Sequence, residues 1–540
     1  MERDSQFDFD FIVVGSGFGG SVAAHRLTEK GYRVAVMEMG RRWTPENLPR
    51  TNWNVWRWLW RPELSLRGFF NMRFFRHVTI LHGCAVGGGS ITYAATLLRP
   101  PDKVWRSGSW AGLADWECEM PQYFSAASRM LGVVENSILG PSDLLLKKAA
   151  ESIGVGHTFY RTNVAIFQSA TAESAGTTVP DPFFNGQGPE RTTCRGCGGC
   201  MMGCQHGAKN TLDLNYLYLA EKYGAKILAE TKVVDVKPLG AKDGSGGYEV
   251  GTVCSTSLVG RHQRRFTARG VVFSASSLGT MELLFALKER GSLPHISDCL
   301  GNEVRTNSES LIGVRIPGCK DDLSKGVAIG SGIYIDQNTH IEAVRYPSGS
   351  DAMSLLSTLL TRGRPGANRI AAWALSLARA AVRHPWRTTR LMFPMQWAQE
   401  SVILLCMRAL DEHIRMRWRR TWLLPFRKHL VSEGKKIPTY IPEANEFAEN
   451  FARLAGGTAM SMLPEILFNV PGTAHCLGGC VMADSPEQGV VDSQHRVFGY
   501  RNMYICDGSV VSSNLGVNPS LTIAALAERA MAKIPPRTSG

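Results

Sequence analysis

Four cysteines stand close together near the middle of the chain, with the spacing of a metal-binding segment. Cys194, Cys197, Cys200 and Cys204 form a C-x2-C-x2-C-x3-C run. This is the spacing of a bacterial ferredoxin, although Gln205 replaces the proline that usually follows. Structural zinc more often uses two separated cysteine pairs. The run therefore predicts either the ligands of an iron–sulfur cluster or four reduced thiols, with structural zinc as a third alternative.

A glycine motif near the N-terminus could bind a nucleotide. The apolar run 11–14 predicts a buried parallel strand and leads into Gly15, Gly17 and Gly20. These glycines permit a tight turn, close approach of the backbone to a pyrophosphate, and close packing of the helix that follows. Glu38 lies about twenty residues further on, where its carboxylate can accept hydrogen bonds from a ribose diol. The unit predicts a dinucleotide site but does not separate NAD from FAD.

A second glycine-rich segment follows at 83–89, where four of seven residues are glycine. Glycine destabilises both helices and strands, so this density is not expected in regular secondary structure. We expect the backbone of this loop to lie against a flat ring or a phosphate group.

The N-terminal residues and the apolar runs bear on where the protein is found. Residues 1–10 are acidic and do not resemble a secretory signal. No run reaches the roughly eighteen apolar residues of a membrane span. We predict a cytoplasmic protein, soluble or attached peripherally to the inner membrane face, whose thirteen cysteines form no disulfide framework.

The formal net charge of +13 favours an anionic partner. No recognised nucleic-acid-binding module is present, and we expect no nucleic acid. The basic residues instead accompany apolar ones in the Trp-rich segment 53–60 and in a region at 366–428 that we expect to be helical. Such segments suit an anionic membrane surface. The alternatives are aromatic packing over a cofactor for the first and a solvated basic face for the second.

Seven motifs together resemble the glucose–methanol–choline (GMC) family of flavin oxidoreductases, and within it the bacterial cholesterol-oxidase-like branch. In family order they are GSGFGGSVAAHRLTEKGYRVAVME, GCAVGGGSITYA, HGAKNTLDLNYL, SASSLGTMELL, TAHCLGG, MYICDGSVV and GVNPSLTIAALAER. The resemblance implies FAD as the dinucleotide. It also implies the cofactor-binding residues Gly15, Gly17, Gly19, Gly20, Glu38, Gly83, Gly87, Gly88, Gly89, Ser90, Val233, Asp507, Gly508, Asn518 and Pro519.

The fold that the resemblance implies is of the α/β class, α+β overall. A Rossmann-like FAD-binding domain is assembled from discontinuous segments, which we place at 1–100, 190–305 and 471–540. A substrate-binding or cap domain, with a mainly antiparallel sheet and helices, takes 101–189 and 306–470.

The resemblance also implies the catalytic residues. Oxidation of a secondary alcohol removes the hydroxyl proton and transfers hydride to flavin N5, so a polar group must hold the oxygen. His475 and Asn518 match the family's His/Asn pair: His475 accepts the proton, and Asn518 holds the oxygen or orients the flavin. Glu342 resembles a carboxylate base that moves a double bond; Glu309 is the alternative base, and either could be a surface carboxylate.

These expectations predict FAD-dependent oxidation of a sterol or another bulky lipophilic alcohol to the ketone, with double-bond isomerisation as an optional second step. The electron acceptor is O2 or an external acceptor. The main alternative is a GMC alcohol dehydrogenase with an iron–sulfur relay to an external acceptor. A third alternative, a lyase that keeps FAD as a structural element, is disfavoured by the intact His/Asn pair.

Overall fold

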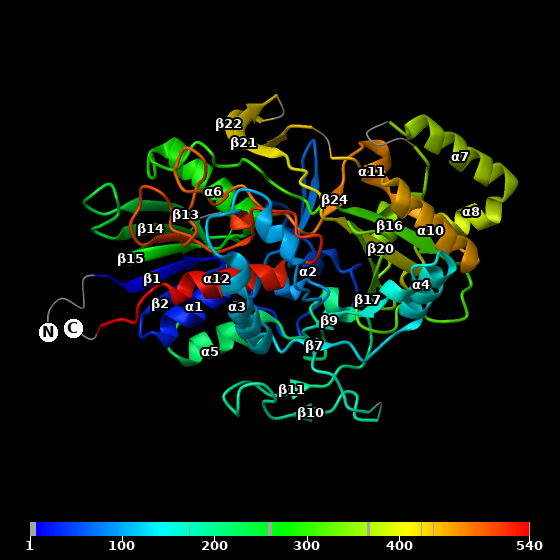
Figure 1. Cartoon of the computed structure of the whole chain (residues 1–540), viewed down its shortest axis with the longest axis horizontal. Coiled ribbons are helices and arrows are strands. Elements are labelled where there is room, and N and C mark those ends of the chain that lie inside the picture. Colours follow the sequence, from blue (N-terminus) through cyan, green and yellow to red (C-terminus); the bar gives the residue numbers. More distant parts are fainter. Residues whose placement is uncertain are drawn as a thin grey trace.

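The computed structural model describes residues 7–538, apart from 172, 258–261, 364–367, 423 and 436. Two seven-stranded sheets organise the described chain, and Figure 1 shows them in adjacent halves of the molecule. Strands of the first sheet come from three separated stretches of sequence. Chain segments far apart in sequence therefore meet between the two halves.

The first sheet is mainly parallel, and its strands β1 and β2 are completely buried. The parallel strands are β1 (Phe9–Val14), β2 (Val34–Met37), β12 (Lys226–Leu228), β15 (Gln263–Phe273) and β25 (Met503–Ile505), while β13 (Thr231–Pro238) and β14 (Tyr248–Cys254) add antiparallel. Burial on both faces explains the continuous apolar run in β1. Helices α1 (Phe18–Glu29), α5 (Tyr216–Lys222) and α12 (Ser520–Ala532) cover one face, with α6 (Ser276–Arg290) opposite (Figure 1).

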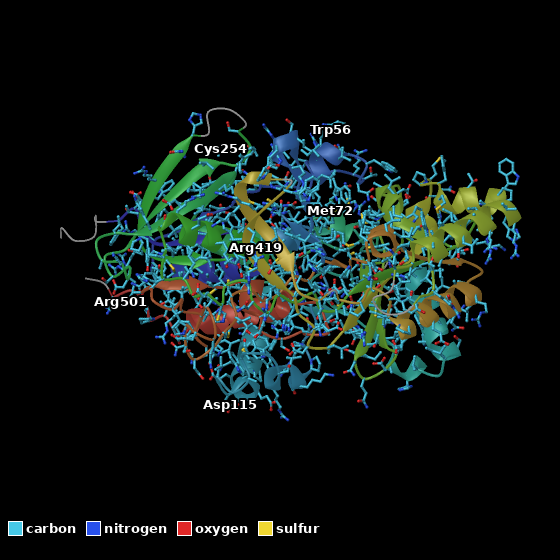
Figure 2. All side chains as sticks on the ribbon, turned by 90° about the horizontal axis from the view of Figure 1, so that it is seen from above. Trp56, Met72, Asp115, Cys254, Arg419 and Arg501 are labelled. Atoms are coloured by element: carbon cyan, nitrogen blue, oxygen red, sulfur yellow. The ribbon has the colours of Figure 1, made fainter. Side chains whose placement is uncertain are left out.

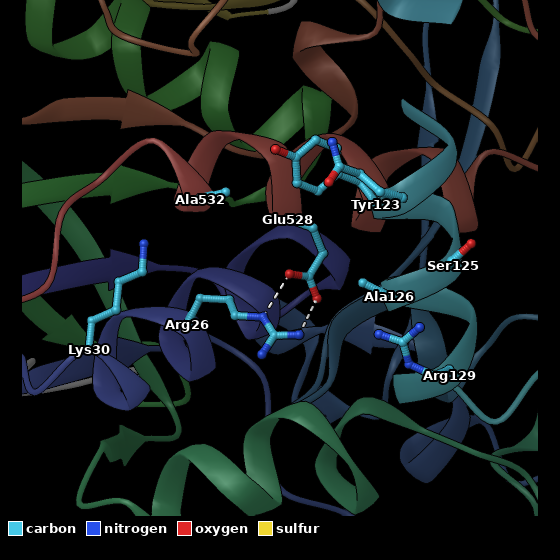
Figure 3. A pocket seen from close by; sticks show the side chains of 9 residues that line it. Arg26, Lys30, Tyr123, Ser125, Ala126, Arg129, Glu528 and Ala532 are labelled. Carbon is cyan, nitrogen blue, oxygen red and sulfur yellow. Dashed lines mark hydrogen bonds and ion pairs between the residues drawn. The ribbon is translucent and has the colours of Figure 1, made fainter. Parts of the chain in front are cut away.

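Helices α1 and α12 are joined near their C-terminal ends. The Nε atom of Arg26 lies 2.7 Å from a carboxylate oxygen of Glu528, and Tyr216 of α5 donates a 2.6 Å hydrogen bond to the same carboxylate. The pair lines a surface cavity of about 480 Å³ beside α3 (Trp116–Met130), seen in Figure 3. The N-termini of α1 and α12, at Phe18 and Ser520, instead lie among the residues predicted to bind cofactor.

The second sheet is antiparallel. Its strands, in spatial order, are β19 (Ser357–Leu359), β23 (Thr458–Met462), β16 (Ser310–Arg315), β20 (Ser401–Arg408), β18 (Thr339–Val344), β17 (Ile329–Tyr334) and β8 (Tyr160–Arg161). Side chains alternate between its two faces. Ile341 and Ala343 face the core formed with α4 (Pro141–Ser152) and α10 (Pro442–Leu454), whereas Glu342 and Val344 face the other way.

Shorter elements complete the described chain. A three-stranded sheet combines β5 (Phe70–Phe74), β6 (Thr79–Gly83) and β24 (Gly472–Thr473). Two-stranded pairs are β3 (Trp60–Arg61) with β4 (Leu66–Arg67), β7 (Val134–Glu135) with β9 (Asn163–Val164), β10 (Thr178–Val179) with β11 (Arg191–Thr192), and β21 (Arg415–Thr421) with β22 (Leu424–Glu433). The remaining helices are α2 (Val55–Trp58), α7 (Ile370–Arg383), α8 (Pro385–Met392), α9 (Trp397–Glu400) and α11 (Leu463–Leu467).

The prediction of a helical region through 428 is wrong in its second half. Helices occupy α7, α8 and α9, but the chain from Ser401 forms strands β20, β21 and β22. The apolar segment 402–407 is the middle of a buried strand, and a short apolar run has no periodicity that separates strand from helix. Residues 366, 367 and 423 of this region lie outside the described residues.

The Trp-rich segment is divided between core and surface. Trp58 and Trp60 are each 4% exposed, whereas Trp53 and Trp56 are 44% and 66% exposed. Aromatic packing and surface exposure therefore both occur in this segment. No described helix combines the length and the apolar character needed to cross a bilayer.

Candidate active site

The residues predicted to bind the cofactor gather at one edge of the first sheet. Strands β1, β2, β15 and β25 run parallel, so their carboxyl ends lie at the same edge. Gly15 follows β1, Glu38 follows β2, and Asp507 stands two residues after β25. Ligands of parallel α/β sheets bind at this edge.

The three glycines of the first motif have the three different environments that a dinucleotide site needs. Gly15 has a φ of +97°, in the left-handed region where glycine is favoured. A Cβ added to Gly20 would lie 2.1 Å from the carbonyl oxygen of Gly15, so a side chain there would separate α1 from the strand. A Cβ on Gly17 would meet no protein atom within 4 Å. The space above Gly17, beside the free N–H groups of the first turn of α1, fits a pyrophosphate.

Glu38 is positioned by the turn that it faces. One carboxylate oxygen accepts hydrogen bonds from the Ser16 amide (3.0 Å) and hydroxyl (2.7 Å), and the other accepts from the Gly40 amide at 2.7 Å. Burial raises the pKa of Glu38, and these hydrogen bonds oppose the effect. The oxygen that accepts from Gly40 keeps a second lone pair for a ribose hydroxyl. Val233 lies on β13 close by, because Thr231 of that strand donates to the Glu38 carbonyl oxygen at 2.8 Å.

The second glycine loop packs against the first. A Cβ on Gly88 would lie 2.6 Å from the Gly17 Cα atom, so the two loops touch beside the open space. Gly83 ends β6, and Gly87 precedes the 3-10 helix Gly88–Ile91 that contains Gly89 and Ser90. The Ser90 hydroxyl donates to the Gly87 carbonyl oxygen at 2.7 Å and accepts from the Leu212 amide at 3.0 Å. Ser90 thus holds the loop in place through bonds within the protein.

Asp507 and Gly508 follow β25 in the chain and pack against the N-terminal part of α6. The Asp507 carboxylate accepts from the Ser509 amide at 2.9 Å and from the Thr280 hydroxyl at 2.5 Å. Pro519 is the residue before α12, with Asn518 preceding it. The residues that surround Gly17 fit the phosphates and ribose of FAD, and direct contact of Asp507 and Ser90 with the cofactor stays a prediction.

His475 lies beside a carboxylate that the sequence placed only as an alternative base. Its Nδ1 atom is hydrogen-bonded to the carboxylate of Glu309, which also accepts from the Ala474 amide at 3.1 Å. The side chains of His475 and Glu309 are 13% and 1% exposed. Burial alone lowers the pKa of His475, but the neighbouring Glu309 carboxylate outweighs it, so the pKa is raised. With Nδ1 held, Nε2 is the nitrogen left for a substrate proton.

Glu342 and Asn518 form the second polar pair of the site. The Asn518 amide donates from Nδ2 to Glu342 at 3.2 Å. Among the described residues, neither Asn518 Oδ1 nor Glu342 Oε1 has a hydrogen-bond partner, although both atoms are buried. Burial raises the pKa of Glu342 to about 8; Asn518 and His475 lower it, while Glu309 raises it. Buried polar atoms without protein partners mark a place where a ligand or water completes the bonding.

Apolar side chains surround Glu342 on its sheet face. Glu342 pairs with Leu405 in the register between β18 and β20, and Val344 and Met407 lie on the same face. Leu405 and Met407 are 7% and 0% exposed. The structure therefore brings His475, Asn518 and Glu342 together beside the apolar side chains of this face.

Asn307 connects the histidine side of the site to the asparagine side. The backbone N–H of Asn307 donates to Asn514 Oδ1 at 3.0 Å. In the Asn307 side chain, Nδ2 donates to the Val517 carbonyl oxygen at 3.0 Å, and Oδ1 accepts from the Gly516 backbone N–H at 2.8 Å. Asn307 and Ser308 have φ values of 57° and 46°. Positive φ at two successive non-glycine residues is unfavourable and is kept only where surrounding contacts enforce it. The segment holds Glu309 against His475 and fixes the loop before Asn518.

A tyrosine–histidine pair lies next to Glu342. Tyr160 and His340 are joined by a 2.6 Å hydrogen bond between the hydroxyl and Nε2. A Cβ on Gly332, the cross-strand partner of Glu342, would lie 2.7 Å from the Tyr160 hydroxyl and 2.8 Å from that nitrogen. Burial lowers the pKa of His340 to about 4, so the ring is neutral near pH 7. The sequence did not predict roles for Asn307, Tyr160 and His340. For Asn307, the available signal was the polar segment Thr306-Asn-Ser-Glu that precedes a strand.

The cysteine run borders this site, because Met201 within the run packs against the apolar cluster of Val344, Leu405 and Met407. Cys194, Cys197, Cys200 and Cys204 line one small cavity with Lys209 and are free thiols. Burial raises the pKa of Cys194 to about 12. In the part of the chain that the structure describes, no group of three or more His, Cys, Asp or Glu side chains is arranged to hold a metal ion. The geometry therefore does not support the cluster that the spacing suggested and favours reduced thiols.

Comparison with known proteins identifies relatives along almost the whole chain. Two family models, both described as GMC oxidoreductase, match residues 9–287 and 425–527. A cholesterol oxidase of Acinetobacter baumannii is 60% identical over 98% of this chain and 95% of its own length. A cholesterol oxidase of Mycobacterium tuberculosis is 44% identical over 97% and 90%.

The fold is also found in solved structures. The crystal structure of pyridoxine 4-oxidase from Mesorbium loti superposes with a TM-score of 0.59 at 14% sequence identity, covering 97% of this chain and 98% of that one. At this identity the likeness concerns the fold alone. The motifs, the sheet edge and the two family models agree, and the chain belongs to the GMC oxidoreductases, a family of FAD-dependent enzymes that oxidise alcohols.

Proposed function

We propose that the protein oxidises the secondary hydroxyl of a sterol, or of another bulky lipophilic alcohol, to the ketone with FAD as cofactor. The observation that carries the proposal is the placement of His475, Asn518 and Glu342 beside the apolar sheet face of Leu405 and Met407. Such a face suits fused apolar rings, and one polar edge suits a single hydroxyl. The names of the two cholesterol oxidases support the same substrate class.

The residues of the chain hold the alcohol and take its proton. Bound FAD supplies the hydride acceptor. His475 accepts the hydroxyl proton at Nε2, while Glu309 holds Nδ1 and stabilises the positive charge that forms on the ring. Asn518 Nδ2 donates one N–H to Glu342, and its second N–H can donate to the alcohol oxygen, which fixes the carbon in place. Displacement of water by the apolar sheet face strengthens these polar contacts.

We also propose that Glu342 carries out a second step, the isomerisation of a double bond. Its carboxylate removes a proton from the carbon between the new ketone and the double bond, and the same proton returns to the far carbon of that double bond. One C–H bond breaks and another forms, so no further reactant is required. A carboxyl with a pKa near 8 is basic enough for this transfer once it is ionised.

For the electron acceptor we propose O2, because both named relatives are oxidases. A relay through an iron–sulfur cluster is not proposed, since no group of three or more His, Cys, Asp or Glu side chains within the described ranges is arranged as a metal site. We further propose that the protein is cytoplasmic and meets its substrate at an anionic membrane surface.

The test is anaerobic reduction of the protein's own flavin. A 3β-hydroxysterol should bleach the flavin absorbance, and admission of O2 should restore it with formation of hydrogen peroxide. A sterol whose 3-hydroxyl is already a ketone is the control and should leave the flavin oxidised. If no sterol, terpenol or long-chain alcohol bleaches the flavin, the proposed function is wrong.

A further inference from the structure

Two elements project from the surface of the molecule: one from the half that carries the second sheet, and one from the border between the two halves. They are the helix pair α7–α8 and the hairpin β21–β22, and together we call them the docking face. Figure 1 shows both along the upper edge of the molecule, and Figure 2, which looks from above, shows both again and labels Arg419 on the hairpin. The two views agree that they lie on one side.

Helix α7 is apolar around most of its circumference but has no fully buried residue. Leu377 and Ala380 pack against a small cluster on the protein. On the rest of the helix, Leu375 and Val382 are 50% and 83% exposed, and Trp386 at the start of α8 is 87% exposed. Exposed apolar surface of this kind marks a contact with another apolar phase or partner.

The hairpin has the same chemistry. Trp422 follows β21 and is 86% exposed, and Phe426 on β22 is 95% exposed. Arg420 and Arg427 are exposed beside them, and no ion-pair partner is found for either within the described residues. Aromatic rings next to arginine are comfortable at a water–lipid boundary, where the ring enters the headgroup layer and the cation stays at its surface.

Charge distinguishes lipid from a neutral apolar partner. Residues 352–399 contain seven arginines and no aspartate or glutamate. Arg369 is buried and donates to the Thr361 carbonyl, and Arg390 pairs with Glu400 at 2.8 Å, so both serve the fold. Arg379 and Arg383 on α7 are exposed and, in the described part of the chain, have no ion-pair partner. Each such cation is attracted to the negative surface of an anionic leaflet.

We propose that the docking face, formed by α7–α8 and β21–β22, binds the surface of an anionic phospholipid bilayer. Trp386, Trp422 and Phe426 enter the headgroup layer, while the free arginines contact lipid phosphates. A helix of 14 residues is too short to span a bilayer, so attachment is to the surface. Only the purpose of this binding rests on the proposed function: a sterol substrate is itself dissolved in a bilayer.

The test uses the FAD-loaded full chain and sedimentation with vesicles. Phosphatidylcholine vesicles are compared with vesicles that carry about one-third phosphatidylglycerol, at low and high salt. We expect binding to the anionic vesicles that weakens as salt rises. A combined Trp386→Ser, Trp422→Ser and Phe426→Ser variant should lose at least tenfold in binding. Combined replacement of Arg379, Arg383, Arg420 and Arg427 by glutamine should remove the preference for anionic lipid.

Two controls keep the result specific. Leu144 on α4 is 50% exposed and Tyr223, directly after α5, is 46% exposed. Both lie away from the docking face, and their combined replacement by serine should leave binding unchanged. Wild-type protein that stays in the supernatant at low salt overturns the proposal, as does a triple serine variant that binds like wild type. Turnover of sterol presented in cyclodextrin is measured separately, so a failure of the proposed activity is distinguishable from a failure of docking.

Discussion

The carboxylate of Glu309 is hydrogen-bonded to Nδ1 of His475, although the two residues are 166 positions apart. This contact leaves Nε2 as the nitrogen that meets substrate and raises the pKa of the ring against the effect of burial. The proton-accepting unit of the site is therefore the pair of His475 and Glu309. Replacing His475 and replacing Glu309 should have different effects on the rate of flavin reduction and on its pH profile.

Replacement of His475 by alanine should slow flavin reduction by sterol by about 10²- to 10⁴-fold, the usual value of a positioned general base. Glu309→Gln should slow it less and should move the midpoint of the pH–rate profile to lower pH, because the anion that raises the histidine pKa is gone. Stopped-flow reduction across pH measures both. A Glu309→Gln profile with the wild-type midpoint would contradict the pairing.

Glu342 should give the isomerisation a pH dependence of its own. Because burial raises the pKa of Glu342 to about 8, the carboxyl is mostly protonated at pH 7, and formation of the conjugated ketone should increase as pH rises toward and past 8. Glu342→Gln should accumulate the unconjugated ketone while flavin reduction continues. The absorbance of the conjugated product distinguishes the two ketones.

The same carboxyl should affect stability. In the unfolded chain a glutamate loses its proton near its ordinary pKa, whereas in the fold Glu342 keeps it up to about 8. Between these values the folded state binds more protons than the unfolded state, so this group makes stability fall as pH rises. Glu342→Gln removes that contribution, and its melting temperature should improve relative to wild type from pH 5 to pH 8. A constant difference over that range would count against the raised pKa.

Asn307 should act on rate more than on substrate binding. Loss of its side-chain bonds to Gly516 and Val517 frees the loop before Asn518, and small misplacement of a catalytic group is costly. We expect Asn307→Gly, which tolerates the positive φ, to lower kcat roughly 10- to 100-fold with little change in KM. Ser308→Gly relieves the neighbouring positive φ while keeping those bonds, and its kcat should stay near wild type. Equal losses in both variants would show that backbone shape alone matters.

Gly17 and Gly20 offer a matched pair for the cofactor site. Gly17→Ala places a Cβ in open space, so the protein should fold normally but bind FAD poorly, because the methyl group occupies the place of the pyrophosphate. Gly20→Ala forces a Cβ to within 2.1 Å of the Gly15 carbonyl oxygen and should destabilise the fold itself. Flavin content per chain, together with circular dichroism, separates the two outcomes.

Local patterns predicted the part of the dinucleotide edge that β1, α1 and β2 form, because that part is local. The apolar strand, Gly15, Gly17 and Gly20 all fall within one strand–turn–helix unit, and Glu38 follows at a fixed spacing. The resemblance supplied His475 and Asn518. The role of Glu309 was not accessible, because contact with His475 depends on how two distant segments cross, and a glutamate in a polar stretch looks the same whether paired or solvated.

Two predictions failed or went unsupported for related reasons. Arginine-rich composition suggested helix beyond residue 400, but the buried strand β20 is set by its place between β16 and β18. The ferredoxin spacing of Cys194 to Cys204 describes separation along the chain, while a metal site requires side chains arranged around one ion. The four cysteines line one cavity, but no group of three or more His, Cys, Asp or Glu among the described residues has that arrangement. The division into domains at 1–100, 190–305 and 471–540 stays a prediction, although every strand of the first sheet falls inside those ranges.

Strand β25 and helix α12 have a consequence for biosynthesis. Both come from the last forty residues, yet β25 pairs with β15 and α12 packs on α1. Synthesis proceeds at about 5–20 residues per second, so β1 is made roughly half a minute or more before β25 and α12. The first sheet therefore stays incomplete until β25 has been translated, and the predicted FAD residues Asp507 and Pro519 join the site only then. A chain that ended before β25 would lack an edge strand of the first sheet and the packing of α12 on α1.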